Sequence, residues 1–288
     1  MASRLAAAAV GSLMMMCAGP LAAQWPSHRD PSVPRVADGR VDLNAPAPRA
    51  ADGHPDLSGV WENIGWRDLS RVTGNISGTG GAPPAPGTPR RPPPVAITRF
   101  FDLSSVVPGG LPLQPWAAAL KSARMAGGNQ DNPDAHCLPL GNMQLHTHPE
   151  PRKIIQTPRL LVILYEGNAG TRQIFIDGRR LPPNDPQPWW YGYSVGKWDG
   201  DTLVVETTGF RDGGWLDVNG SPLTDAGRTI ERFRRPSVGS LTIDVTIDDS
   251  RAYTKPWSVT LTQHLMPDDE LIEFVCQENE RDAQHFVR

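Results

Sequence analysis

Residues 241–248 read LTIDVTID, and four aliphatic side chains alternate in them with threonine and aspartate. Such alternation gives a β-strand one apolar face and one polar face. Residues 257–265, WSVTLTQHL, repeat the pattern, with Gln263 as the exception on the apolar side. Two strands of this kind, close together in the chain, predict an antiparallel pair that covers a core with one of its faces.

Several short segments elsewhere have the composition of strands, because most are rich in Ile, Leu and Val and turn residues bound them. The predicted strands are residues 153–156, 160–165, 172–176, 194–198 and 202–207, with a last one at residues 270–277. Asp199 and Gly200 form a pair suited to a tight hairpin, since both can take positive φ. One short helix is predicted at residues 115–126, where apolar residues recur at steps of three and four. Short turns without long helical crossovers favour a mainly β fold, either an antiparallel up-and-down barrel or a strongly curled sheet.

The composition excludes several classes of protein. Of the 288 residues 30 are Pro and 28 are Gly, which indicates long loops and argues against coiled coils and helical bundles. The formal net charge is -3, so the chain lacks the basic footprint of a nucleic-acid binder. The sequence contains no GxSxG elbow, Gly-rich phosphate loop or dinucleotide fingerprint, which disfavours α/β-hydrolases, P-loop NTPases and Rossmann dehydrogenases.

The first residues have the layout of a secretory signal peptide. Arg4 supplies a positive charge, residues 5–17 are almost wholly apolar, and small residues precede Gln24. We therefore predict a signal peptide at residues 1–23 and a periplasmic or secreted mature protein. Cys17 leaves a lipoprotein anchor as an alternative. No later segment approaches the roughly 20 apolar residues of a transmembrane helix, so none is expected.

The mature chain divides into an arm and one domain. Residues 24–55 are rich in Pro, Ala, Asp and Arg without an apolar period, which predicts an extended arm. Residues 56–288 are predicted to form a single β-barrel-like domain. A Pro/Gly-rich stretch at residues 74–94 is predicted to be a flexible insertion in it.

Two cysteines remain after the signal peptide, Cys137 and Cys276. In an oxidising compartment an isolated pair favours a disulfide bond. This bond would join the middle of the chain to the predicted last strand. Two buried free thiols are the alternative interpretation.

Many short blocks occur together in this chain in a fixed order. Four of them are DLSGVW (56–61), CLPLG (137–141), GDTLVVETTGF (200–210) and AYTKPW (252–257). With these blocks the chain resembles a widespread group of exported bacterial β-rich proteins of unassigned function, over about residues 52–282. The resemblance implies export and a β-rich fold, and it implies no particular chemistry.

A second similarity concerns the start of the domain. Residues 59–61, GVW, followed by a meander of strands, are similar to the lipocalin entry motif. In lipocalins this Trp closes the floor of an eight-stranded barrel that holds a ligand. The similarity implies a lipocalin-like or calycin-like barrel, although a shared fold does not assign a function.

Residues 145–150, LHTHPE, contain the most suggestive local group of polar side chains. On an extended segment His146, His148 and Glu150 would project from one face, as in a metal site with two His and one carboxylate. Pro149 would interrupt a regular strand here. Metal-free catalysis by a histidine and a solvent-exposed histidine pair are the alternatives. We expect no cofactor and leave a metal open.

A second group of candidates lies where predicted strands begin or end. Tyr165 and Glu166 end one strand, and Asp177 and Arg179 follow the next. The aromatic residues before the following strand are Trp189, Trp190, Tyr191 and Tyr193. At a barrel mouth these side chains could bind an apolar substrate beside a proton-transferring Tyr or carboxylate. Alternatively, the aromatic residues plug the barrel and Asp177 with Arg179 caps a hairpin.

Glu206 lies at the centre of a Val-rich predicted strand. A buried carboxylate there needs a partner or a raised pKa. Arg232 or Arg234 on a following strand could supply the positive charge, so we expect a structural ion pair across the strands.

Three functions fit these features. The first is a cofactor-free lyase, isomerase or hydrolase acting on a small hydrophobic or aromatic molecule by general acid-base chemistry. In it His146 or His148 is the base, Tyr165 or Glu166 the acid or orienting group, and the aromatic residues are the apolar wall. The second is a non-catalytic small-molecule carrier with the same site. The third is an envelope interaction module that uses the Pro-rich segments. The sequence leaves the oligomeric state open.

Overall fold

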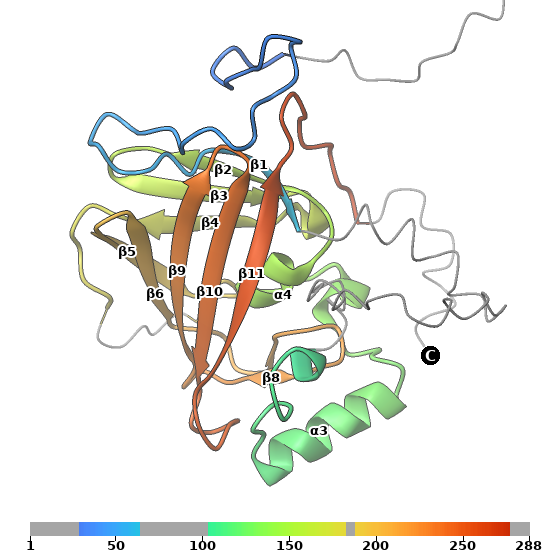
Figure 1. The fold of residues 1–288 in the computed structure, drawn as a ribbon. Helices are drawn as coiled ribbons and strands as arrows, with labels where there is room; N and C mark the ends of the chain where they lie inside the picture. Colours follow the sequence, from blue (N-terminus) through green and yellow to red (C-terminus); the bar gives the residue numbers. More distant parts are fainter. Residues whose placement is uncertain (1–28, 64–102, 183–187, 277–288) are drawn as a thin grey trace, which may run out of the picture.

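The computed structural model describes residues 29–63, 103–182 and 188–276 (Figure 1). The predicted signal peptide and the insertion at residues 74–94 lie outside the described residues. Within the described residues nine strands form a closed barrel, and a separate two-stranded sheet accompanies it. The predicted barrel of mainly antiparallel strands is therefore confirmed.

The barrel strands follow the order β1-β11-β10-β9-β6-β5-β4-β3-β2, and β2 pairs back with β1. They are β1 (Gly59–Asn63), β2 (Arg152–Gln156), β3 (Leu160–Tyr165), β4 (Thr171–Phe175), β5 (Tyr193–Asp199), β6 (Thr202–Thr208), β9 (Arg228–Ser237), β10 (Ser240–Asp248) and β11 (Trp257–Leu265). Neighbouring strands are antiparallel except β4 and β5, which pair in parallel. This exception requires the chain to return to the same end of the barrel between these two strands.

Other elements lie outside the barrel wall. They are the helices α3 (Pro115–Ala126) and α4 (Asn142–Thr147), the 3₁₀ turns η2 (Leu103–Ser105), η3 (Pro133–His136) and η4 (Gly167–Ala169), and the short strands β7 (Gly214–Trp215) and β8 (Pro222–Leu223). In Figure 1 α3 and β8 lie below the barrel, and the N-terminal arm lies above it. Among these described helices, none has the length and apolar content needed to span a lipid bilayer.

The alternating stretch that predicts the fold turns its aliphatic face inward. All four aliphatic side chains of β10 are buried, and β11 contributes Leu261 and Leu265 to the same core. Val245 pairs with Val259 across the two strands, so the apolar faces of β10 and β11 lie on the same side of the sheet. Trp61 of β1 is completely buried and donates its Nε1 hydrogen to the Leu57 carbonyl, at 3.0 Å.

The hairpin between β5 and β6 differs by one residue from the prediction. Asp199 pairs with Thr202, so the two turn residues are Gly200 and Asp201. Only Gly200 has a positive φ, of 59°. Asp201 instead accepts hydrogen bonds from the Arg49 guanidinium, at 2.5 and 2.7 Å. The turn therefore uses the glycine as predicted, while Asp199 remains a strand residue.

The predicted last strand at residues 270–277 is wrong. Residues 271–276 form no strand, and Gln277 lies outside the described residues. The physical reason is that β11 has no open edge, because β1 pairs with it through Trp61 and Leu265. This segment is held instead by the disulfide bond between Cys137 and Cys276, which confirms the predicted pair.

Candidate functional site

A group of ionisable side chains lies inside the barrel, at the end where α4 packs. We call His146, Tyr165, Arg172 and Glu231 the buried cluster. They come from α4, β3, β4 and β9, and each is at most 4% exposed. Since unpaired charges are costly in an apolar interior, the contacts among these groups decide whether the barrel tolerates them.

Arg172 and Glu231 form the ionic centre of the cluster. Arg172 Nη1 donates to Glu231 Oε1 at 2.9 Å, and Nη2 contacts the other carboxylate oxygen. Arg172 also donates to the hydroxyl groups of Ser194 and Thr207, at 3.0 to 3.2 Å. Such bidentate pairing with added hydrogen bonds satisfies both charges inside the barrel.

His146 connects this ion pair to Tyr165. Its Nε2 lies 2.8 Å from Glu231 Oε1, and its Nδ1 lies 3.3 Å from the Tyr165 hydroxyl. Burial raises the pKa of the Glu231 carboxyl, but the charge and hydrogen bonds of Arg172, together with the contact to His146, outweigh burial and lower that pKa to about 2. Arg172 Nη1 also lies 3.1 Å from His146 Nε2. The contact of Nε2 with Glu231 is shorter, and an ionised carboxylate can only accept, so we assign the hydrogen to Nε2 and let Nδ1 accept from Tyr165.

The remaining electrostatics keep the cluster in this protonation state. Burial lowers the pKa of His146, which favours the neutral ring. Burial also raises the pKa of Tyr165 to about 12, so its hydroxyl keeps its proton. The Tyr165 hydroxyl therefore donates to His146, and His146 donates to Glu231.

Arg152 supports the backbone that carries His146. This completely buried side chain donates to the carbonyls of His146 and His148, at 2.8 and 2.9 Å. Asn63 of β1 donates to the same two carbonyls, at 3.0 and 2.6 Å. Burial lowers the pKa of Arg152 to about 10. These bonds fix the last turn of α4 and hold the His146 ring in place.

We expect the free energy of unfolding to decrease as the pH is lowered from about 6.5 toward 2. The pKa of Glu231 is about 2 in the folded chain and 4.5 normally, so its stabilisation is complete above pH 4.5 and lost as the pH falls toward 2. His146, with a folded pKa below 6.5, adds a loss that begins near that pH. Urea unfolding at pH 7, 5 and 3 measures both losses. The loss below pH 5 should shrink in Glu231→Gln, and an equal loss in both proteins would contradict this assignment.

Sequence reasoning missed three of these residues, Arg152, Arg172 and Glu231. Each lies two positions from an apolar core residue on a strand, as Arg172 does from Ile174 and Glu231 from Phe233. In a strand such spacing places the charged side chain on the buried face, so this spacing could have identified the three residues. On β9 the spacing is ambiguous, because the neighbouring Ile230 suggests that the other face of the strand is buried.

His146, His148 and Glu150 do not share one face, as the candidate metal site would require. The segment is not one extended stretch, because residues 142–147 form α4 and the extended conformation begins at His148. His146 faces Glu231, whereas His148 Nδ1 lies 3.0 Å from Glu150. Within residues 29–63, 103–182 and 188–276, no three His, Cys, Asp or Glu side chains are grouped so that they could hold a metal ion.

The other predicted site residues do not join the buried cluster. Glu166 accepts a hydrogen bond from the Ile272 backbone at 3.0 Å. Arg179 pairs with Asp177 and donates to the Tyr193 hydroxyl at 3.0 Å. Because the adjacent Ser194 points inward to Arg172, Tyr193 points to the outside of the barrel.

The remaining aromatic candidates are divided between surface and interior. Trp189 is half exposed, whereas Tyr191 is partly buried against the core. Trp190, with Asn142, Phe210 and other residues, lines a cavity of about 20 Å³ beside α4. A cavity of this size holds about one water molecule.

Glu206 is not the buried carboxylate of the barrel. Its side chain is 38% exposed and lies 2.9 Å from Arg228. The expected ion pair across strands is present, but its partner is neither Arg232 nor Arg234. β6 presents Val205 and Thr207 to the interior, so Glu206 between them points outward.

Comparison of the chain with protein-family models, with curated proteins and with solved structures found no match to any of them.

Proposed function

We propose that this protein is an exported, cofactor-free enzyme that uses general acid-base chemistry on a small hydrophobic or aromatic molecule. The observation that carries the proposal is the chain of hydrogen bonds from Tyr165 to His146 to Glu231, inside a closed barrel. A neutral histidine between a hydroxyl and a carboxylate is the arrangement that activates a proton-transferring group. Arg172 keeps Glu231 ionised and in position.

The geometry suggests a two-step transfer. Tyr165 takes a proton from the substrate while its own proton moves to His146 Nδ1. The imidazolium formed is stabilised by Glu231, which already accepts the Nε2 hydrogen. Return of the proton to another atom of the substrate completes an isomerisation, and its loss with a leaving group completes an elimination. The positive charge on His146 exists only between these two steps.

Export agrees with the same proposal. The disulfide bond between Cys137 and Cys276 is compatible with an oxidising compartment such as the periplasm. The residue pattern at the N-terminus supports a signal peptide at positions 1–23. Substrates would then be small molecules that reach the cell envelope.

Replacing Tyr165 by Phe should lower turnover at least 100-fold, because the proton path loses its first hydroxyl. The assay incubates the mature protein in D₂O with a panel of small aromatic and alicyclic ketones, lactones and halides. Mass spectrometry then records deuterium incorporation, isomerisation and loss of a leaving group. The wild-type protein should convert at least one compound, and Tyr165→Phe should bind it without converting it.

The matched control is His264→Gln, because His264 is exposed on β11 and does not contact the buried cluster. This variant should keep the wild-type rate. Equal turnover in wild type and Tyr165→Phe would overturn the proposal. Binding of a compound by the wild-type protein without any conversion would favour the carrier function instead.

A further inference from the structure

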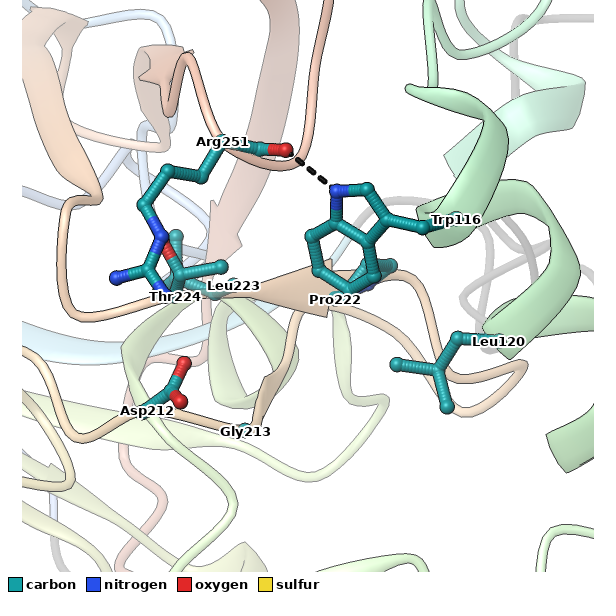
Figure 2. Close-up of a pocket in the computed structure, with 8 residues that line it drawn as sticks. All are labelled: Trp116, Leu120, Asp212, Gly213, Pro222, Leu223, Thr224 and Arg251. Carbon is teal, nitrogen blue, oxygen red and sulfur yellow. Dashed lines mark hydrogen bonds between the residues drawn. The ribbon is translucent and has the colours of Figure 1, made fainter.

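A second hollow lies outside the barrel, between α3 and β8 (Figure 2). Its volume is about 450 Å³, within the range of small-molecule sites. It is lined by Trp116, Leu120, Asp212, Gly213, Pro222, Leu223, Thr224 and Arg251. We call it the α3 cavity. None of the residues of the buried cluster lines it, so its chemistry is independent of the proposed active site.

One side of the α3 cavity is an apolar wall. Trp116 is 46% exposed although it is the largest apolar side chain of α3. Its indole Nε1 donates to the Arg251 carbonyl at 2.7 Å, which fixes the ring at the edge of the hollow. Figure 2 shows Leu120 on the same side, also from α3. A fixed, exposed indole beside a leucine offers a surface for an apolar or aromatic group.

Two oppositely charged residues line the α3 cavity, Asp212 and Arg251. Among the described residues the Asp212 carboxylate makes no hydrogen bond or ion pair, and it lies across the hollow from Leu120 (Figure 2). The guanidinium of Arg251 already pairs with Asp225. Behind the wall, the buried Asp249 accepts hydrogen bonds from Thr224 at 2.7 and 3.0 Å. Of the two charged residues that line the cavity, Asp212 is therefore the one whose charge has no partner among the described residues.

We propose that the α3 cavity binds a small organic monocation with an apolar body, such as a primary ammonium that carries an aromatic ring. Asp212 would accept hydrogen bonds from the ammonium group in a charge-assisted contact. Trp116 and Leu120 would cover the apolar body, and the indole face would add attraction to the cation. A metal ion fits less well, because the apolar residues of the wall provide no ligands.

Three aromatic probes of similar size test this charge preference. They are phenethylamine, 2-phenylethanol and phenylacetate, which are cationic, neutral and anionic at pH 7. Titration calorimetry of the mature protein, with probes up to about 10 mM, covers the weak affinities of such small ligands. Phenethylamine should bind at least fivefold more tightly than 2-phenylethanol, and phenylacetate most weakly.

Two variants place the binding in the α3 cavity. Asp212→Asn keeps the shape of an exposed turn residue and removes its charge, so phenethylamine should bind at least fivefold more weakly. Trp116→Leu should weaken the binding of both phenethylamine and 2-phenylethanol, and that of phenethylamine more, because the cation also loses the attraction of the indole face. The matched control is Asp199→Asn, because Asp199 is 77% exposed at the far end of the β5–β6 hairpin and should leave binding unchanged.

Three results would overturn the proposal. The first is no detectable binding of phenethylamine, and the second is equal affinity for all three probes. The third is unchanged binding in Asp212→Asn while its melting temperature equals that of the wild type. None of these results depends on turnover, so they leave the proposed enzyme function untouched.

Discussion

Replacing Glu231 by Gln is expected to lower the free energy of unfolding by about 3 to 5 kcal/mol. The substitution keeps the shape of the side chain but leaves Arg172 charged and completely buried without its counter-ion. It also leaves one neutral amide oxygen where two carboxylate oxygens accepted from Arg172 and His146. Urea unfolding at pH 7 measures the change, since urea does not screen charges as guanidinium does.

The exposed pair of Glu206 and Arg228 provides the matched control for this result. Both strands are part of the same sheet, but these side chains are 38% and 44% exposed. Glu206→Gln should therefore cost less than about 1 kcal/mol. A similar cost for the two glutamates would show that the buried cluster does not contribute to the stability of the barrel.

A double variant separates the net contribution of the ion pair from the cost of breaking it. Glu231→Leu together with Arg172→Met replaces both charges by apolar groups. It should recover much of the stability lost in Glu231→Gln, because no unpaired charge remains. A conserved fold with lost turnover in this variant would indicate that the charges serve chemistry rather than folding.

Removing the disulfide bond is the second change with a large expected effect. In Cys137→Ser with Cys276→Ser, the free energy of unfolding should fall by up to about 5 kcal/mol, the loop-entropy limit for a separation of 139 residues. The closed loop contains β2 to β11, so the bond limits the unfolded chain over most of the barrel. Urea unfolding of this double variant and of the oxidised wild type measures the difference.

The native structure should change little in the same variant. Residues 271–276 belong to no strand, and four of the six are exposed, so the barrel itself does not depend on them. Circular dichroism should therefore remain that of the wild type at pH 7. Stability within about 1 kcal/mol of the wild type would mean that the reduced unfolded chain retains structure that the bond otherwise imposes.

Local patterns in the sequence were sufficient for most of the barrel wall. The aliphatic residues of 241–248 alternate with polar ones over a whole strand, and they are all buried as predicted. The helix at residues 115–126 ends at Gly127 and Gly128, and its predicted bounds agree with α3. These features depend on neighbours within a few residues, where the periods of strand and helix act directly.

The candidate site was only partly accessible from the sequence. His146 and Tyr165 were identified because their residue types carry acid-base chemistry, and the structure brings them to 3.3 Å. Glu231 was missed because TIER, residues 229–232, gives no local sign of which face is inside. Its face is decided by the pairing of Glu231 with Val205 and Val245 on the neighbouring strands.

The sequence alone determined the strand periods, the position of α3, the turn glycine at position 200 and the two cysteines available for a disulfide. Each follows from local sterics, local hydrophobic alternation or the chemistry of a residue type. The tertiary structure decided which strands close the barrel, and hence that Arg172 of β4 meets Glu231 of β9 and His146 of α4. These contacts join residues 26 to 85 positions apart. The periodicity of single strands and helices gives no information on contacts between residues so far apart in the chain. Closure of the sheet creates the interior in which four separate elements place their polar groups against one another.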